Sequence, residues 1–133
     1  MVEFALAAIP LLFLTFGMFD MGRAIYLYNA TAEAAREIAR VTTVHPYSTC
    51  CTYGSSAQTQ AVIADQEVAI PGLTSSGIAV SCVDIADAPV AAAACRPGDF
   101  VKVTVRVTWT PATPLLSALG DIHVSSVSRM ELQ

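Results

Sequence analysis

An uncharged apolar run near the amino terminus constrains this chain more than any other feature. Residues 4–19 read FALAAIPLLFLTFGMF, with Glu3 before the run and Asp20 after it. As an α-helix this run extends about 24 Å, slightly less than the ~30 Å hydrocarbon core of a bilayer. The residues that follow complete a span if Asp20 and Arg23 lie at the membrane interface. The sequence therefore predicts that residues 1–28 form a helix that lies in a membrane or in another apolar environment.

The acid at the start of this run argues against two simpler interpretations. A secretory signal peptide begins with a basic segment, whereas this chain has Glu3 there. An ordinary membrane anchor does not explain a carboxylate at the tip of an apolar helix. A carboxylate in hydrocarbon is costly, so Glu3 indicates a partner or a function.

The helical pattern continues beyond the apolar run. Residues 29–44 are rich in alanine and contain no proline, which predicts one helix over residues 2–43, about 63 Å long. Pro10 and Gly17 mark positions where its first half can kink. Apolar residues recur in its second half at spacings of three and four: Ala24, Leu27, Ala34, Ile38 and Val41. We expect this amphipathic half to pack on the rest of the protein.

Residues 45–133 read as a small α/β head. Ser56 can cap a short helix over residues 57–67. Three segments predict strands: residues 77–83, 100–110 and 122–132. In the second of them, valines alternate strictly with polar residues. The predicted fold is therefore α+β, with a three-stranded antiparallel sheet whose one face is covered by the long helix.

Four cysteines all lie in the head: Cys50, Cys51, Cys82 and Cys95. An even count in a small domain after an apolar segment predicts two disulfides in an oxidising compartment. A bridge between adjacent cysteines is strained, so we expect Cys50 and Cys51 each to pair with Cys82 or Cys95. A metal site that includes His45 is the rival interpretation, but adjacent cysteines are poor chelators.

Charge and motif content exclude several functions. Charged residues make up 14% of the chain, and 11 acidic residues outnumber 7 basic ones, which gives a net charge of −4. Such a chain cannot neutralise a run of phosphates, so we expect no nucleic-acid partner. No common nucleotide-binding, hydrolase or metalloprotease motif is present in the sequence. We therefore expect neither enzymatic activity nor a cofactor.

Both ends of the chain resemble a known family. The segment V-E-F-A-L-x-x-x-P at residues 2–10, followed by Gly17, Gly22-Arg23 and Ala34-Ala35-Arg36, is similar to the amino-terminal signature of TadE/TadG-like pilins. The carboxyl-terminal sequences VKVTVRVTWTPATPLLSALG and VSSVSRMEL resemble the alternating strand, proline-leucine turn and closing strand of that family. Together these segments cover about half of the chain.

The resemblance implies a pilin-like fold, in which a long helix and a small head form a ladle. It implies an inner-membrane prepilin that is processed by a prepilin peptidase and taken up by the inner-membrane pilus assembly machinery. The product is an extracellular type IV-like (Tad) filament, which is a helical homopolymer used for adhesion. Glu3 then corresponds to the family's near-terminal glutamate, which neutralises the terminal amine of a neighbouring subunit.

This interpretation assigns subunit assembly to the apolar half of the helix. The expected assembly residues are Glu3, Phe4, Leu6, Pro10, Leu11, Leu12, Phe13, Leu14, Phe16, Gly17 and Phe19. Two alternatives stay open. One is a minor pilin or pseudopilin that primes or caps the filament, and the other is a membrane-anchored periplasmic binding domain.

Overall fold

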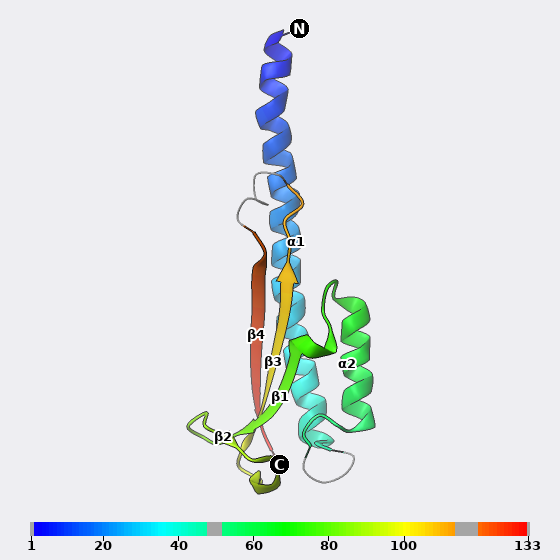
Figure 1. Ribbon diagram of the computed structural model, residues 1–133, viewed down its shortest axis with the longest axis vertical. Coiled ribbons are helices and arrows are strands. Elements are labelled where there is room, and N and C mark those ends of the chain that lie inside the picture. The colour runs from blue at the N-terminus through cyan, green and yellow to red at the C-terminus, as the bar shows by residue number, and fades with distance from the viewer. Residues whose placement is uncertain (1, 48–51, 114–119, 133) are drawn as a thin grey trace.

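One helix dominates the structure. The computed structural model describes residues 2–47, 52–113 and 120–132. Helix α1 (Val2–Val44) is 43 residues long and continues through Pro10 (Figure 1). Its amino-terminal half projects beyond the head, whereas its carboxyl-terminal half lies beside the sheet. The single long helix predicted from the sequence is therefore confirmed.

The head contains a four-stranded antiparallel sheet. Its strands are β1 (Ile78–Val83), β2 (Pro89–Val90), β3 (Phe100–Trp109) and β4 (Ile122–Glu131). Their spatial order is β2-β1-β3-β4, so the long strand β3 lies between β1 and β4. The α+β fold with a long amino-terminal helix and an antiparallel sheet is confirmed.

The sheet has one strand more than the three predicted. Strand β2 has only two residues and carries no alternating pattern of its own. It forms because the carboxylate of Asp84 accepts hydrogen bonds from the backbone N–H groups of Ala86 (2.9 Å) and Ala88 (2.8 Å). These bonds reverse the chain, so that Val90 pairs with Cys82. A local side-chain turn therefore creates the extra strand.

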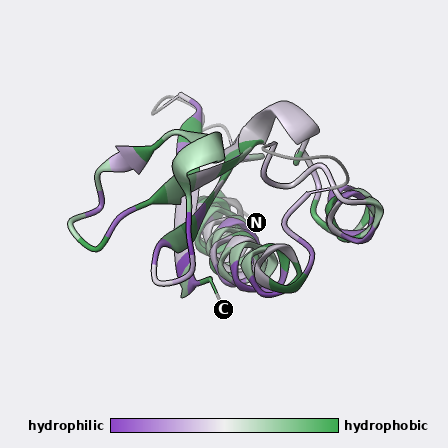
Figure 2. Ribbon diagram, turned by 90° about the horizontal axis from the view of Figure 1, so that it is seen from below, coloured by the Kyte–Doolittle hydropathy of each residue, from purple (hydrophilic) through white to green (hydrophobic). Residues whose placement is uncertain are grey.

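The core lies between α1 and the sheet. Ala34, Ala35 and Ile38 of α1 are fully buried, as are Val101 and Val103 of β3. In the view along α1, the sheet lies against the helix and α2 (Ala57–Ala69) lies to one side (Figure 2). Each buried valine or isoleucine side chain contributes about 1.5–3 kcal/mol relative to an exposed one. The predicted amphipathic face of the helix is thus the face that packs on the head.

The opposite face of α1 carries paired charges. Arg36 lies 3.5 Å from Glu33, and Arg40 donates hydrogen bonds of 2.6 and 2.9 Å to Glu37. The Arg40 guanidinium holds the pKa of the Glu37 carboxyl below its usual range. Exposed pairs of this kind stabilise a helix by only a few tenths of a kcal/mol. They keep this face of the helix in water and contribute little to stability.

The second helix begins where the sequence predicts. The Ser56 hydroxyl accepts a hydrogen bond from the Thr59 N–H (3.1 Å), which caps α2 at its amino terminus. The Thr59 hydroxyl lies 3.4 Å from that of Thr42 on α1, and both side chains are buried. Helix α2 thus docks on α1 partly through a pair of buried hydroxyl groups.

The cysteine pairing differs from the prediction. Cys82 on β1 is bonded to Cys95, with 6.3 Å between their Cα atoms. The expectation that each of these two pairs with Cys50 or Cys51 is therefore wrong. The β1–β2 turn brings the chain back along β1, so Cys95 returns to Cys82 only 13 residues later. Cys50 and Cys51 lie outside the described residues.

The disulfide makes a testable contribution to stability. Replacing both Cys82 and Cys95 with alanine should lower the free energy of unfolding by about 3 kcal/mol, because a closed loop of this length restricts the unfolded chain. Urea unfolding of the detergent-solubilised protein, followed by Trp109 fluorescence, measures the change. The control Ser125→Ala, an exposed serine on β4, should leave the transition unchanged. An unaltered transition in the double variant would contradict the prediction.

Candidate assembly site

The large apolar side chains in the amino-terminal half of α1 are left exposed by the residues that the structure describes. Phe4 is 79% exposed, and the other large apolar side chains between residues 2 and 19 are exposed as well. Among the described residues, α1 is the one helix that is long and apolar enough to cross a membrane. Monomeric soluble proteins rarely expose an apolar surface of this size. An apolar partner, either lipid or protein, must cover it.

The predicted assembly residues all lie within residues 2–19, which we call the uncovered segment. Gly17 is half-buried, and the other predicted residues have exposed side chains. The exposed residues are Glu3, Phe4, Leu6, Pro10, Leu11, Leu12, Phe13, Leu14, Phe16 and Phe19. Because they surround the helix rather than form one stripe, the segment can be contacted from several sides at once.

Glu3 lies in the first turn of α1, where a negative charge interacts favourably with the helix dipole. Its carboxylate is exposed, and it makes no hydrogen bond or ion pair with any residue that the structure describes. Glu3 can therefore accept a cation from outside the subunit without breaking a contact within it.

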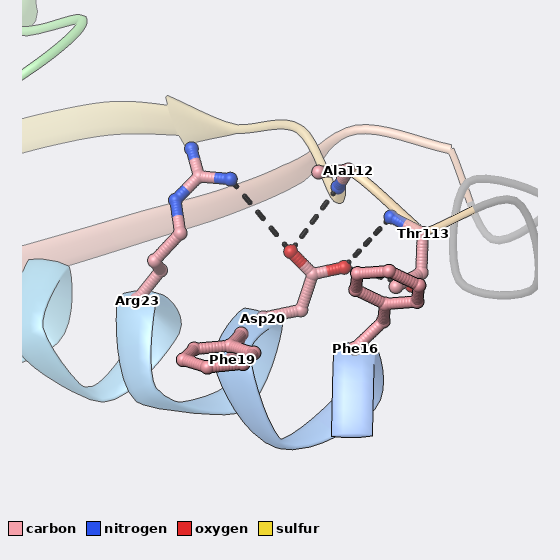
Figure 3. A pocket seen from close by; sticks show the side chains of 6 residues that line it. All are labelled: Phe16, Phe19, Asp20, Arg23, Ala112 and Thr113. Carbon is pink, nitrogen blue, oxygen red and sulfur yellow. Dashed lines mark hydrogen bonds and ion pairs between the residues drawn. The ribbon is translucent and has the colours of Figure 1, made fainter. Parts of the chain in front are cut away.

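A buried carboxylate joins the helix to the head where the uncovered segment ends. Asp20 is 2% exposed. Its carboxylate accepts hydrogen bonds from the Thr113 N–H (2.8 Å), the Thr113 hydroxyl (2.7 Å) and the Ala112 N–H (3.2 Å), as Figure 3 shows. Arg23 lies 3.7 Å from the same carboxylate and is largely exposed. These donors compensate the ionised carboxylate for its loss of water. We call this arrangement the Asp20 clasp.

The sequence alone does not predict this clasp. It favours a membrane interface for Asp20, because an acid that ends an apolar run is normally solvated there. The donors follow strand β3 and lie more than 90 positions later in the chain. The segment Pro111-Ala112-Thr113 is a plausible turn, but nothing in it identifies its acceptor. Only the packing of β3 along α1 brings the two together.

Two grooves flank the Asp20 clasp. One is about 310 Å³ and is lined by Phe16, Phe19 and Arg23 together with the clasp (Figure 3). The other is about 640 Å³ and lies between α1 and the ends of β3 and β4. We call the latter the apolar groove. Its helix wall includes Phe13, Leu14, Gly17, Met18 and Met21, and its head wall includes Trp109, Ile122 and Val124.

The cysteines of the head do not form a metal site in the described part of the chain. Cys82, Cys95 and Asp99 lie close enough together to hold an ion. However, the two sulfur atoms are bonded to each other, and a disulfide lacks the thiolate that a metal requires. This cluster therefore has a structural role.

The family comparison agrees with the resemblance inferred from the sequence. Residues 1–40 match the model of the TadE-like protein family. This match covers the uncovered segment, the Asp20 side of the clasp and most of the helix that packs on the head. It supports a pilin-like protein associated with a Tad pilus. Comparison with curated proteins and with solved structures finds no match.

The Asp20 clasp predicts a local change in hydrogen exchange. In Asp20→Ala the amides of Ala112 and Thr113 lose their acceptor, so they should exchange about tenfold faster or more. Mass spectrometry of peptides that cover residues 108–113 measures this in the detergent-solubilised protein. Glu33→Ala, which removes an exposed acid from the same helix, is the control. Equal protection in the Asp20 variant would show that the clasp does not hold this turn.

Proposed function

We propose that this protein is a structural pilin subunit that polymerises through its amino-terminal helix into an extracellular type IV-like (Tad) filament. The observation that carries the proposal is the apolar segment at residues 2–19, whose large side chains are exposed and which continues into the part of α1 that packs on a small folded head. Before assembly the segment lies in the inner membrane, where a prepilin peptidase and the pilus assembly machinery act on the subunit. After assembly the heads form the surface of the filament, which serves adhesion.

Energetic considerations support the transfer from membrane to filament. Lipid chains are as apolar as leucine, so leaving the bilayer for a bundle of identical helices changes little in hydrophobic free energy. Outside the membrane, however, the bundle is what keeps the segment from water. Ala5, Ala7, Ala8 and Gly17 are small residues on the segment that allow close approach, and nothing lies within 4 Å of the position that a Cβ of Gly17 would occupy. A contact between different surfaces of identical subunits forms an open helix when it does not close into a ring.

Glu3 is proposed to select the correct stagger between subunits. A carboxylate enclosed among apolar helices without a cation is strongly unfavourable. A register that brings it to the terminal amine of a neighbouring subunit relieves this cost, whereas other registers leave it unpaired. The proposal involves neither catalysis nor a cofactor, so Glu3 acts by charge pairing alone.

The proposal is tested by examining filaments sheared from producing cells. Electron microscopy and mass spectrometry of the same fraction should show thin filaments that consist mainly of this chain. Trace amounts in filaments made of another subunit would indicate a minor pilin or pseudopilin that primes or caps assembly. Recovery from membranes alone would favour a membrane-anchored binding domain and would contradict the proposal.

Removing the Glu3 charge provides a specific prediction. Glu3→Ala should leave the head folded and the helix inserted in the membrane, because the Glu3 carboxylate makes no hydrogen bond or ion pair with a described residue of its own chain. It should nevertheless reduce incorporation into filaments at least about tenfold, since the charge pair that sets the stagger is lost. Immunoblots of the sheared and membrane fractions measure both quantities. Glu33→Ala is the matched control on the exposed face of the same helix, and normal filament yield from Glu3→Ala would refute the role of the charge.

A further inference from the structure

We infer that the apolar groove is the receptor for the amino-terminal segment of a second copy of this chain. This inference rests on the proposed function and identifies a contact between the head of one subunit and the helix of its neighbour in the filament. The groove lies beside the Asp20 clasp, between α1 and the ends of β3 and β4. Its occupant is residues 4–12 of the neighbouring subunit.

The chemistry of the groove selects an uncharged apolar occupant. The described residues that line it carry no charge, and Thr113 contributes its polar group to the clasp. Its volume of about 640 Å³ suits several large side chains. Residues 4–12 of the same chain are likewise uncharged, and Phe4, Leu6, Leu11 and Leu12 among them are exposed. The two surfaces match in polarity, and no described residue of the subunit covers either of them.

The shape of the groove admits a helix. Gly17 and Ala24 form part of its helix wall, and Gly17 has open space at its Cβ position. Small residues allow two helix axes to approach to about 8 Å, the lower end of the usual range. The head wall, which includes Ile122 and Val124 of β4, then contacts the far side of the incoming helix. A neighbour is thereby held on two sides rather than by the helix alone.

The occupant must come from another subunit. Helix α1 is continuous from Val2 to Val44, so residues 4–12 cannot fold back into the groove of their own chain. The middle of that segment lies about 14 Å further along the helix than Gly17. The donor and the receptor are therefore different surfaces of one molecule, displaced along its axis. Such a contact repeats without closing, as a filament requires.

The groove also continues the surface that the proposed function already uses. Phe13, Leu14 and Gly17 belong both to the uncovered segment and to the helix wall of the groove. A neighbouring helix that packs along this side of the uncovered segment therefore reaches the head without leaving apolar surface. Lipid could cover the helix wall, but it would not require the head wall to be apolar as well.

A photo-crosslinking amino acid identifies the occupant directly. Placed at position 122 in producing cells, it should form a covalent dimer whose linked peptide contains residues 4–12 of the second copy. Placed at position 127 it should form none, because Val127 is exposed on the other side of the same strand, outside the groove. Adducts at position 122 that contain only lipid, or another protein, would overturn the inference.

Matched substitutions test the same contact by incorporation. Ile122 is 40% exposed and Val127 is 55% exposed, so lysine at either position should leave the head folded, which far-ultraviolet circular dichroism of the purified variants checks. Ile122→Lys should lower recovery in the sheared filament fraction about tenfold or more, because it places a charge in an apolar contact. Val127→Lys should have no more than about a twofold effect, typical of an exposed position. Equal incorporation of the two variants would contradict the inference.

A pair of glycines provides a second, independent test. Gly17 lines the groove, whereas Gly22 lies about 140° around the helix, and both have open space at their Cβ positions. Gly17→Leu should block incorporation, and Gly22→Leu should be tolerated better.

The outcomes that would refute this inference differ from those that would refute the proposed function. Filaments that contain the chain but show no link between position 122 and residues 4–12 refute the groove alone. A linked dimer in membranes, with the chain absent from filaments, supports the groove and refutes the filament role.

Discussion

The rest of the structure depends on the close packing of a stripe of small residues on α1 against the valine face of β3. Ala34 and Ala35 present only methyl groups, and both are completely buried together with Ile38. Val101, Val103 and Val105 fill the other side of the contact and are completely buried. Because interiors pack at nearly crystalline density, this contact holds β3 alongside the helix, with the two elements running in opposite directions (Figure 1). It also brings the end of β3 to the level of Asp20, where the covered part of the helix ends.

The Asp20 clasp converts this packing into a defined boundary. On the amino-terminal side of Asp20, the large apolar side chains of α1 are exposed. On its carboxyl-terminal side, one face of the helix packs on the head. An ionised carboxylate in such a place is tolerated only because the turn at Ala112 and Thr113 supplies backbone and hydroxyl donors. Thr113 of the same turn lines both grooves. This polar contact therefore lies where the uncovered segment ends and beside both grooves.

The uncovered segment and the apolar groove are two exposed apolar surfaces on one subunit, and each needs an apolar partner. In the proposed pathway, lipid covers the segment before assembly, so no protein helix is required to cover it there. Both surfaces would lose this cover when the subunit leaves the membrane. A neighbour that fills the groove, as we propose, would bury its own segment at the same time, so one contact would remove two apolar surfaces from water. This coupling would favour assembly at the membrane over release of free subunits.

Local patterns in the sequence were sufficient for much of this fold. The apolar run, the spacing of Leu27, Ala34 and Ile38, the Ser56 cap and the alternation of β3 are short-range signals, and each element forms where they predict. Other features depend on residues far apart in the chain, or on a turn whose effect appears only when the sheet forms. The Asp20 clasp, the pairing of Cys82 with Cys95 and strand β2 are of this kind. The chain by itself thus determined that a long helix would present an apolar, acid-tipped segment. Only the tertiary structure decided where the head packs on that helix and which groove lies beside the contact. Both depend on contacts between α1 and the last third of the chain.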